Sequence, residues 1–136
     1  ELGVERVRPY VPRSLLDSGR LVLPGPAAAP VPLLMYSPSG YFSRVVDSAI
    51  EQSSLALFGY RAFEAEMTDV LADLALQGMG IAWLPDSSLV SGRLAELVAV
   101  ADGVWDVGVS IVAYRARVHA RAVVGQLWER ICAAQG

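Results

Sequence analysis

The feature that most constrains this chain is the stretch LADLALQGMGIAWLPDSSLVSGRLAEL at residues 71–97. Apolar residues recur at helical spacing up to Gly78, and the short apolar segment GIAWLP follows at once over residues 80–85. Gly78 stands where a left-handed residue ends a helix. The stretch therefore predicts a helix, a tight turn and a buried strand in direct succession.

The same alternation extends along the chain. We expect strands over residues 31–37, 55–63, 80–85 and 107–115, and helices behind Ser37-Pro38-Ser39-Gly40, over 66–77, over 87–94 and near the C-terminus. Residues 4–12 carry two prolines and predict an edge strand or an extended crossing segment, and residues 14–30 predict a surface connection. Strands that alternate with helices favour an α/β fold whose mostly parallel sheet is flanked by helices.

Local signals refine the expected helices. Ser37 and Asp86 are natural N-caps for the helices that follow them. The helix over 66–77 is expected to present one apolar stripe, formed by Met67, Val70, Leu71, Leu74 and Ala75. The dipeptide Asp102-Gly103 predicts a turn.

Composition limits the class of protein. The chain of 136 residues is 54% apolar, which is enough for the core of one domain or less. It has no run of eighteen apolar residues, so we expect no membrane partner. The single cysteine, Cys132, excludes an intramolecular disulfide framework, fits a reducing, cytoplasmic compartment and is expected to be a small core residue. The chain begins at Glu1 without a leader and is interpreted as a piece of a longer protein.

The charges argue against direct contact with nucleic acid. The net charge is −3, every cation apart from the histidine is an arginine, and the arginines are scattered. The nearest approach to a cluster is Arg115, Arg117 and Arg121, which we expect to be solvated surface. A nucleic-acid interface needs basic residues gathered on one face.

Catalytic and metal-binding patterns are weak. His119 is the only histidine, and with Cys132 it cannot complete a zinc site, so we expect no catalytic residue, metal or cofactor. Glu64 and Glu66 could be a pair of catalytic carboxylates, but their place beside a helix start also suits the helix dipole. Gly-Met-Gly at 78–80 follows a helix and precedes a strand, the reverse of a dinucleotide-binding loop.

Two loops are candidates for binding a small molecule. Ser37 and Ser39 follow one expected strand, and Phe63, Glu64 and Ala65 end the next. In a parallel α/β sheet the carboxyl ends of the strands face one edge, where ligands bind and where free backbone N–H groups favour polar or anionic molecules. This pattern favours a binding protein over an enzyme.

The stretch at 71–98 closely resembles a signature of the LysR-type transcriptional regulators, in which a helix runs into a Gly-x-Gly-Ile-Ala-x-Leu-Pro strand and then a short helix. PLLMYSPSGYFSRVVDSAIEQ at 32–52 resembles the opening of the second lobe of the family's effector-binding domain. VGVSIVAYRARVHARAVVGQLWERI at 107–131 resembles its final strand, the passage between lobes and the C-terminal helix. Essentially the whole chain can be placed in this way.

The resemblance implies a two-lobed domain folded like the type 2 periplasmic binding proteins, with a small effector between the lobes. Residues of about 14–110 would form the second lobe, and 1–13 and 111–136 would belong to an incomplete first lobe. DNA would be a partner only through an N-terminal winged helix-turn-helix that this sequence does not contain. Uncovered apolar surface also leads us to expect a homo-oligomer.

The resemblance also implies site residues. Ser37, Ser39, Phe63, Glu64 and Ala65 match positions that line the effector pocket, although the charge of Glu64 would repel an anionic effector. The sequences of these motifs most resemble the hypochlorite-responsive branch of the family, in which methionine oxidation acts as the switch.

The candidate redox sensors are accordingly Met35, Met67 and Met79, of which Met67 falls in a matching position. The alternative is that Met35 and Met67 belong to the core and Met79 to a turn.

Two other hypotheses about the function remain open. A solute-binding protein outside the cytoplasm shares the two-lobed architecture but would carry an export signal. A two-lobed enzyme would need a catalytic group with a shifted pKa in its cleft, for which the sequence offers no good candidate.

Overall fold

The computed structural model describes residues 1–89, 92–100, 103–118 and 121–135. It forms two compact units: Arg6–Gly108, and Glu1–Glu5 together with Val109–Gly136. We call them the sheet unit and the terminal unit. In the residues described, no helix has the length and apolar character needed to cross a membrane.

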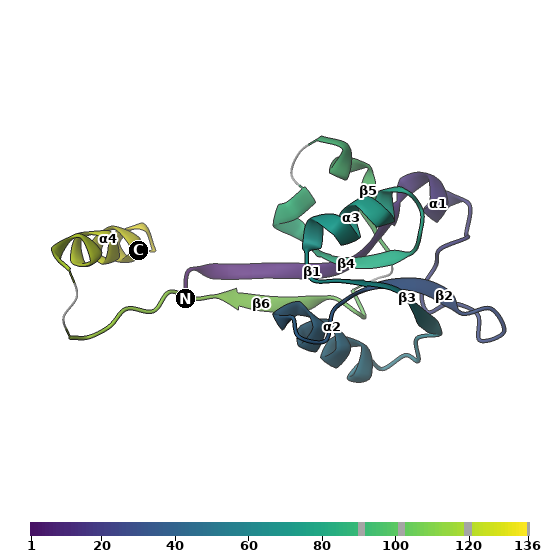
Figure 1. Ribbon diagram of the computed structural model, residues 1–136, viewed down its shortest axis with the longest axis horizontal. Coiled ribbons are helices and arrows are strands. Elements are labelled where there is room, and N and C mark those ends of the chain that lie inside the picture. The colour runs from purple at the N-terminus through teal and green to yellow at the C-terminus, as the bar shows by residue number, and fades with distance from the viewer. Residues whose placement is uncertain (90–91, 101–102, 119–120, 136) are drawn as a thin grey trace. The chain divides into compact units, whose positions relative to one another are not determined.

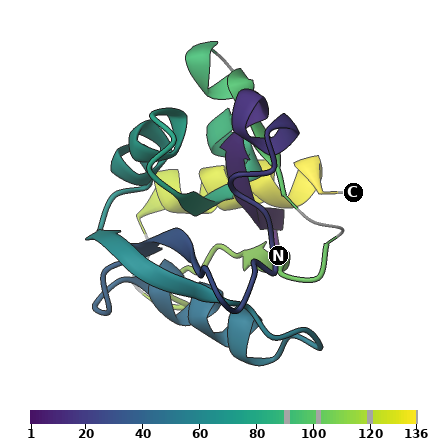
Figure 2. The ribbon, with the colours of Figure 1, turned by 90° about the vertical axis from the view of Figure 1, so that its right-hand side faces the viewer.

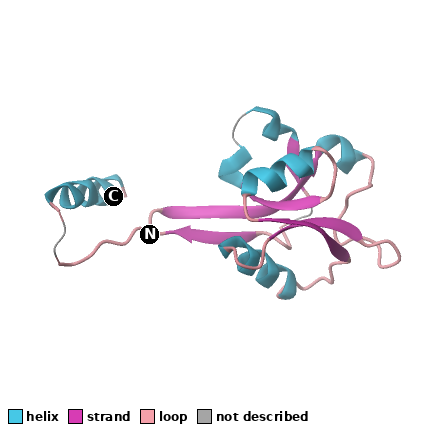
Figure 3. Cartoon of the chain, viewed as in Figure 1, coloured by secondary structure: helices cyan, strands magenta, loops and turns pink. Residues whose placement is uncertain are grey.

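The strands are β1 (Gly3–Pro12), β2 (Val31–Tyr36), β3 (Gly59–Ala65), β4 (Ile81–Pro85), β5 (Leu97–Ala99) and β6 (Val107–Ile111) (Figures 1 and 3). The helices are α1 (Arg13–Asp17), α2 (Tyr41–Glu51), α3 (Thr68–Leu76) and α4 (Ala122–Ala134), with 3-10 turns at Asp86–Leu89 and Gly92–Glu96.

The sheet is mixed, with strand order β3-β2-β4-β1-β5, and β6 also pairs with β1. β2 is parallel to both β3 and β4, whereas β1 is antiparallel to β4 and β5. Helices α2 and α3 cover opposite faces of the sheet (Figures 1 and 2), as right-handed crossovers in opposite directions along a sheet require. The predicted α/β fold with a helix-flanked sheet is confirmed. The sheet is mixed where a mostly parallel one was expected, because the parallel pairing is confined to β3, β2 and β4.

β4 lies at the centre of the core. All five of its residues are buried, and it is paired with β2 on one side and β1 on the other. A strand that is covered on both faces has a continuous run of apolar residues, which explains the segment IAWLP. Leu34, Val7 and Leu71 bring β2, β1 and α3 into the same core.

β1 pairs with β4 over Val7–Tyr10 and with β5 over Tyr10–Pro12, so it lies between these two strands in the sheet and the expectation of an edge strand is wrong. The register places Pro9 opposite Trp83 and Val7 opposite Pro85. Because proline has no N–H, we infer that the ladder bonds fall on the alternate pairs, and that the backbone polar groups of Trp83 face β2. Pro9 is accommodated because its carbonyl turns the other way and accepts from the Val100 N–H at 2.8 Å.

The two glycines of Gly-Met-Gly have different roles. Gly78 has φ +75°, which confirms the predicted left-handed end of α3. Gly80 is buried, and a Cβ there would lie 2.6 Å from the carbonyl oxygen of Pro32. Glycine is therefore needed at 78 for its backbone conformation and at 80 for the close approach of β2.

Some predicted boundaries are wrong. The strand expected over 55–63 is β3, which begins at Gly59 and ends at Ala65. Met67 precedes α3 in extended conformation, outside the helical period, and is 62% exposed. Val70 is also exposed, and the buried face of α3 consists of Leu71, Ala72 and Ala75.

The predicted side-chain caps are also wrong. Residues 37–40 form a turn, closed by the Gly40 N–H on the Ser37 carbonyl at 2.9 Å, and α2 starts after Gly40 without a side-chain cap. Asp86 opens a 3-10 turn and its carboxylate binds β1 instead. The predicted strand over 107–115 ends at Ile111. Asp102 and His119 lie outside the described residues, although Gly103 has the positive φ of a turn.

In the terminal unit, the Leu2 N–H donates to the Ile111 carbonyl at 2.6 Å, and the side-chain amide of Gln135 donates to the Leu2 carbonyl at 2.9 Å. Cys132 is exposed, which contradicts the core position expected from its apolar neighbours, because α4 has no buried residue. Cys132 lines a groove of about 240 Å³ with Trp128.

The arginines expected at the surface, Arg115, Arg117 and Arg121, are exposed. Arg115 lies over the ring of Trp128, with 5.0 Å between the guanidinium carbon and the ring centroid.

Gly80→Ala should destabilise the chain because its Cβ meets backbone that cannot move alone. We expect a loss of about 2–3 kcal/mol in the free energy of unfolding, measured by urea denaturation. Met79→Ala is the matched control, since Met79 is exposed in the same turn, and should change stability by less than about 0.5 kcal/mol. Equal effects of the two substitutions would contradict the assigned role of Gly80.

Candidate functional site

The candidate site is the edge at which three parallel strands end. β2, β3 and β4 run in the same direction and finish at Tyr36, Ala65 and Pro85. The loops that follow therefore leave from one edge, which we call the carboxyl edge. Open α/β sheets bind ligands at this kind of edge.

Two of the predicted loops are joined there. The Ser37 N–H donates to the Ala65 carbonyl at 3.0 Å, and the Ser39 hydroxyl donates to Glu66 Oε1 at 3.4 Å. The predicted residues Ser37, Ser39 and Ala65 thus lie together, although the two serines are almost thirty residues from Ala65 in the sequence. The turn at Ser39 and the start of α3 are held as one surface.

The other two predicted residues lie within β3. Phe63 is 46% exposed. Arg61 donates to Glu64 Oε1 at 3.0 Å and to Asp47 Oδ1 at 2.7 Å, so one guanidinium joins β3 to α2. Glu64 is thus an ion-paired carboxylate, which weakens its repulsion of an anion.

Glu64 and Glu66 have separate partners, Arg61 and Ser39. This arrangement gives no support to a catalytic carboxylate pair.

A buried tyrosine underlies this edge and was not among the predicted site residues. The Tyr36 hydroxyl donates to the Trp83 carbonyl at 3.0 Å and lies 3.2 Å from Thr68 Oγ1. Its ring lies 5.3 Å from that of Phe42 at the start of α2. Burial raises the pKa of Tyr36, against the lowering effect of the bond to Thr68. The available signal was a tyrosine at the end of an apolar strand, because a buried Tyr O–H needs a partner.

Asp86, after β4, holds the second half of β1. Arg8 Nε donates to Asp86 Oδ1 at 2.8 Å, and the Tyr10 hydroxyl donates to the same oxygen at 2.6 Å. Burial alone would raise the pKa of Asp86, but the hydrogen bonds from Arg8 and Tyr10 outweigh it and the pKa lies below its ordinary value. Burial, and then the bond to Asp86, raise the pKa of Tyr10 to about 12.

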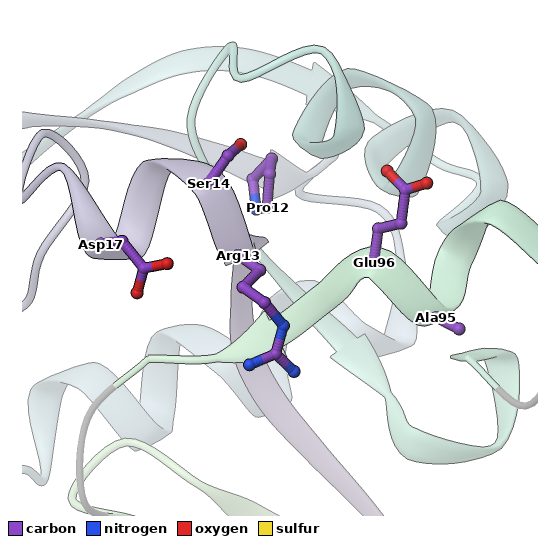
Figure 4. Close-up of a pocket in the computed structure, with 6 residues that line it drawn as sticks. All are labelled: Pro12, Arg13, Ser14, Asp17, Ala95 and Glu96. Atoms are coloured by element: carbon purple, nitrogen blue, oxygen red, sulfur yellow. The ribbon is translucent and has the colours of Figure 1, made fainter.

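A cavity of about 450 Å³ lies elsewhere on the sheet unit, lined by Pro12, Arg13, Ser14, Asp17, Ala95 and Glu96. Because β1 is antiparallel to β4, it runs past the amino end of β4 to Pro12. Pro12 and the cavity that it lines therefore lie away from the carboxyl edge. Figure 4 shows the side chains of Arg13 and Glu96 pointing in different directions, so the cavity lacks a convergent set of polar groups. Among the described residues, no cluster of three or more His, Cys, Asp or Glu side chains could hold a metal ion.

Residues 1–134 match the family described as the LysR substrate binding domain. The chain belongs to this family. The resemblance that the motifs predicted is therefore confirmed, and the carboxyl edge lies in a LysR substrate-binding domain.

Its relatives include the HTH domain-truncated transcriptional regulator QseD of Escherichia coli O157:H7 and the HTH-type transcriptional regulator YjiE of Escherichia coli K12. Each is 29% identical over 101 residues, which are 74% of this chain and 41% and 33% of the relatives. The chain thus spans well under half the length of these regulators.

A similar solved structure is the regulatory domain of HypT from Salmonella typhimurium in its apo form. The TM-score is 0.80 at 24% identity, over 98% of this chain and 63% of that one. This likeness concerns the fold.

Asp86→Asn should destabilise the domain in a pH-dependent way. The carboxylate with the lowered pKa stabilises fully above about pH 4 and loses its effect as the pH falls through its folded value. We expect a loss of about 1–3 kcal/mol at pH 7 and a difference that disappears in acid.

The raised pKa of Tyr10 makes stability depend on pH in the opposite direction. The contribution of Tyr10 to the free energy of unfolding is present below about pH 10 and declines as the pH rises to about 12. Urea denaturation in acid, at neutral pH and in alkali measures the effects of both Asp86 and Tyr10 on the free energy of unfolding. Asp17→Asn, at an exposed carboxylate, is the control. A constant difference between Asp86→Asn and the parent from pH 2 to 7 would exclude the assigned role.

Proposed function

We propose that this chain is the effector-sensing part of a LysR-type transcriptional regulator and is not an enzyme. The observation that carries the proposal is the family match over residues 1–134. Both relatives are named as transcriptional regulators, which favours this function over a solute-binding protein. The carboxyl edge then binds a small molecule.

Ser37, Ser39, Phe63, Glu64 and Ala65 are the proposed effector contacts. Hydroxyls and the free N–H groups at the start of α2 can bind a polar group. The exposed ring of Phe63 offers an apolar contact. Since Glu64 is already bound by Arg61, we propose a small polar molecule that carries an apolar part.

We further propose that residues of about 14–110 are the second lobe and that 1–13 and 111–136 contribute to the first. The compactness of Arg6–Gly108 supports this division. Effector binding would close the lobes and bias a helix-turn-helix outside this sequence, so DNA is bound only through that part. The protein would act in the cytoplasm.

The exposed strand β3 and the exposed Val123 and Leu127 of α4 support a homo-oligomer. An uncovered strand edge and apolar helix residues are surfaces that a second copy can cover.

A thermal-shift screen of small metabolites on this chain tests the proposed function. A ligand raises the melting temperature by mass action. Ser39→Ala and Phe63→Ala should weaken binding of a hit by about tenfold, the equivalent of one lost hydrogen bond or apolar contact.

Ser54→Ala and Phe58→Ala are the matched controls, because both residues are exposed before β3 begins. A hit that loses affinity only with the control variants would contradict the proposed site.

Met67 is the proposed redox-sensing residue. It is 62% exposed, Met79 is 54% exposed, and Met35 is 3% exposed in β2. Limited hypochlorite treatment followed by peptide mass spectrometry should find the sulfoxide at Met67 and Met79 before Met35, because exposure governs oxidation. Met67→Gln, but not Met79→Gln, should then change the affinity for a ligand found in the screen. Equal effects of the two would contradict a specific role for Met67.

A further inference from the structure

We propose that Tyr36, Trp83 and Trp105 form a hydrogen-bonded relay between the carboxyl edge and the residues where the chain leaves the sheet unit. They act as positioning residues: a displacement of the edge loops moves the residues before β6. The relay rests on the proposed function only in so far as an effector is what displaces those loops.

The first link lies directly under the proposed effector contacts. Tyr36 precedes Ser37, and its hydroxyl is also within 3.2 Å of Thr68, the first residue of α3. Its donation to the Trp83 carbonyl ties both edge loops to the backbone of β4. The bond uses a side chain, so it depends on where the loops hold the Tyr36 ring.

The second link leads from β4 to the exit of the unit. The indole Nε1–H of Trp83 donates to the Trp105 carbonyl at 3.0 Å. The next residue, Asp106, accepts from Arg6 at 3.0 Å through its Oδ2. Arg6 and Gly108 are the two residues at which the chain enters and leaves the sheet unit.

Burial makes this relay stiff. Trp83 is fully buried, Trp105 is 1% exposed and Tyr36 is 2% exposed, so water does not compete for the bonds. Among the described residues the indole Nε1–H of Trp105 has no partner, so this residue joins the relay through its carbonyl. Tightly packed rings with few rotatable bonds transmit a displacement because the core cannot absorb it.

Tyr36→Phe in the full 136-residue chain tests the relay. Tyr41→Phe is the control, because Tyr41 is exposed and its ring, like that of Tyr36, lies against Phe42. The readout is the set of backbone and indole N–H signals in two-dimensional ¹⁵N NMR, with Trp128 of the terminal unit as an internal reference. We expect hydrogen exchange of the Trp83 indole to rise about fivefold, from the loss of about one hydrogen bond, and the signals of Trp105 and Asp106 to move.

A purely structural role is distinguished by a second variant. In a Trp83→Phe background, which lacks the indole donor, Tyr36→Phe should no longer move the Asp106 signal, whereas a general loosening of the core would still move it. Thr68→Ala should act in the same direction as Tyr36→Phe without cutting into the core.

Changes confined to β2 and α3, with Trp105 and Asp106 unmoved, would overturn the relay. No ligand is needed, so this failure is distinct from failure of the metabolite screen, which bears on the proposed function alone.

Discussion

The burial of β4 between a parallel and an antiparallel neighbour is the constraint on which the sheet unit depends. Ile81 and Ala82 pair with β2, and Ala82 to Pro85 pair with β1. Gly80 permits the close approach of β2, and the alternation of ladder bonds admits Pro9 and Pro85 without an unpaired donor. One short apolar strand thus joins the parallel half of the sheet to the antiparallel half.

The site and the relay both follow from this strand. Because β4 is parallel to β2, its end lies beside Ser37, and Asp86 can hold Arg8 and Tyr10 at the same edge. Because Trp83 turns its backbone toward β2 and its indole toward Trp105, the same residue touches both ends of the proposed connection. In a LysR substrate-binding domain, this arrangement would place ligand sensing and the exit of the chain on one rigid element.

The sequence was sufficient for the order of most elements and for the edge that carries Ser37, Ser39 and Ala65, because apolar periodicity and parallel topology decide both. It failed where a contact joins distant residues: Asp86 looked like a helix cap, and Tyr36 and Trp83 looked like ordinary core. Cys132 was expected in the core and Met67 in an apolar stripe, but α4 buries none of its residues and Met67 lies just outside its helix. The lobe division and the effector contacts stay predictions.

Native-state hydrogen exchange of the backbone amides, followed by NMR, tests the central role of β4 most directly. The inferred ladder bonds involve the N–H groups of Ala82, Leu84, Arg8 and Tyr10. The structure predicts that these four amides exchange last, only through global unfolding, and that amides of the exposed strand β3 exchange earlier. Exchange of the Ala82 and Leu84 amides as fast as those of β3 would contradict the central role of β4 in the sheet unit.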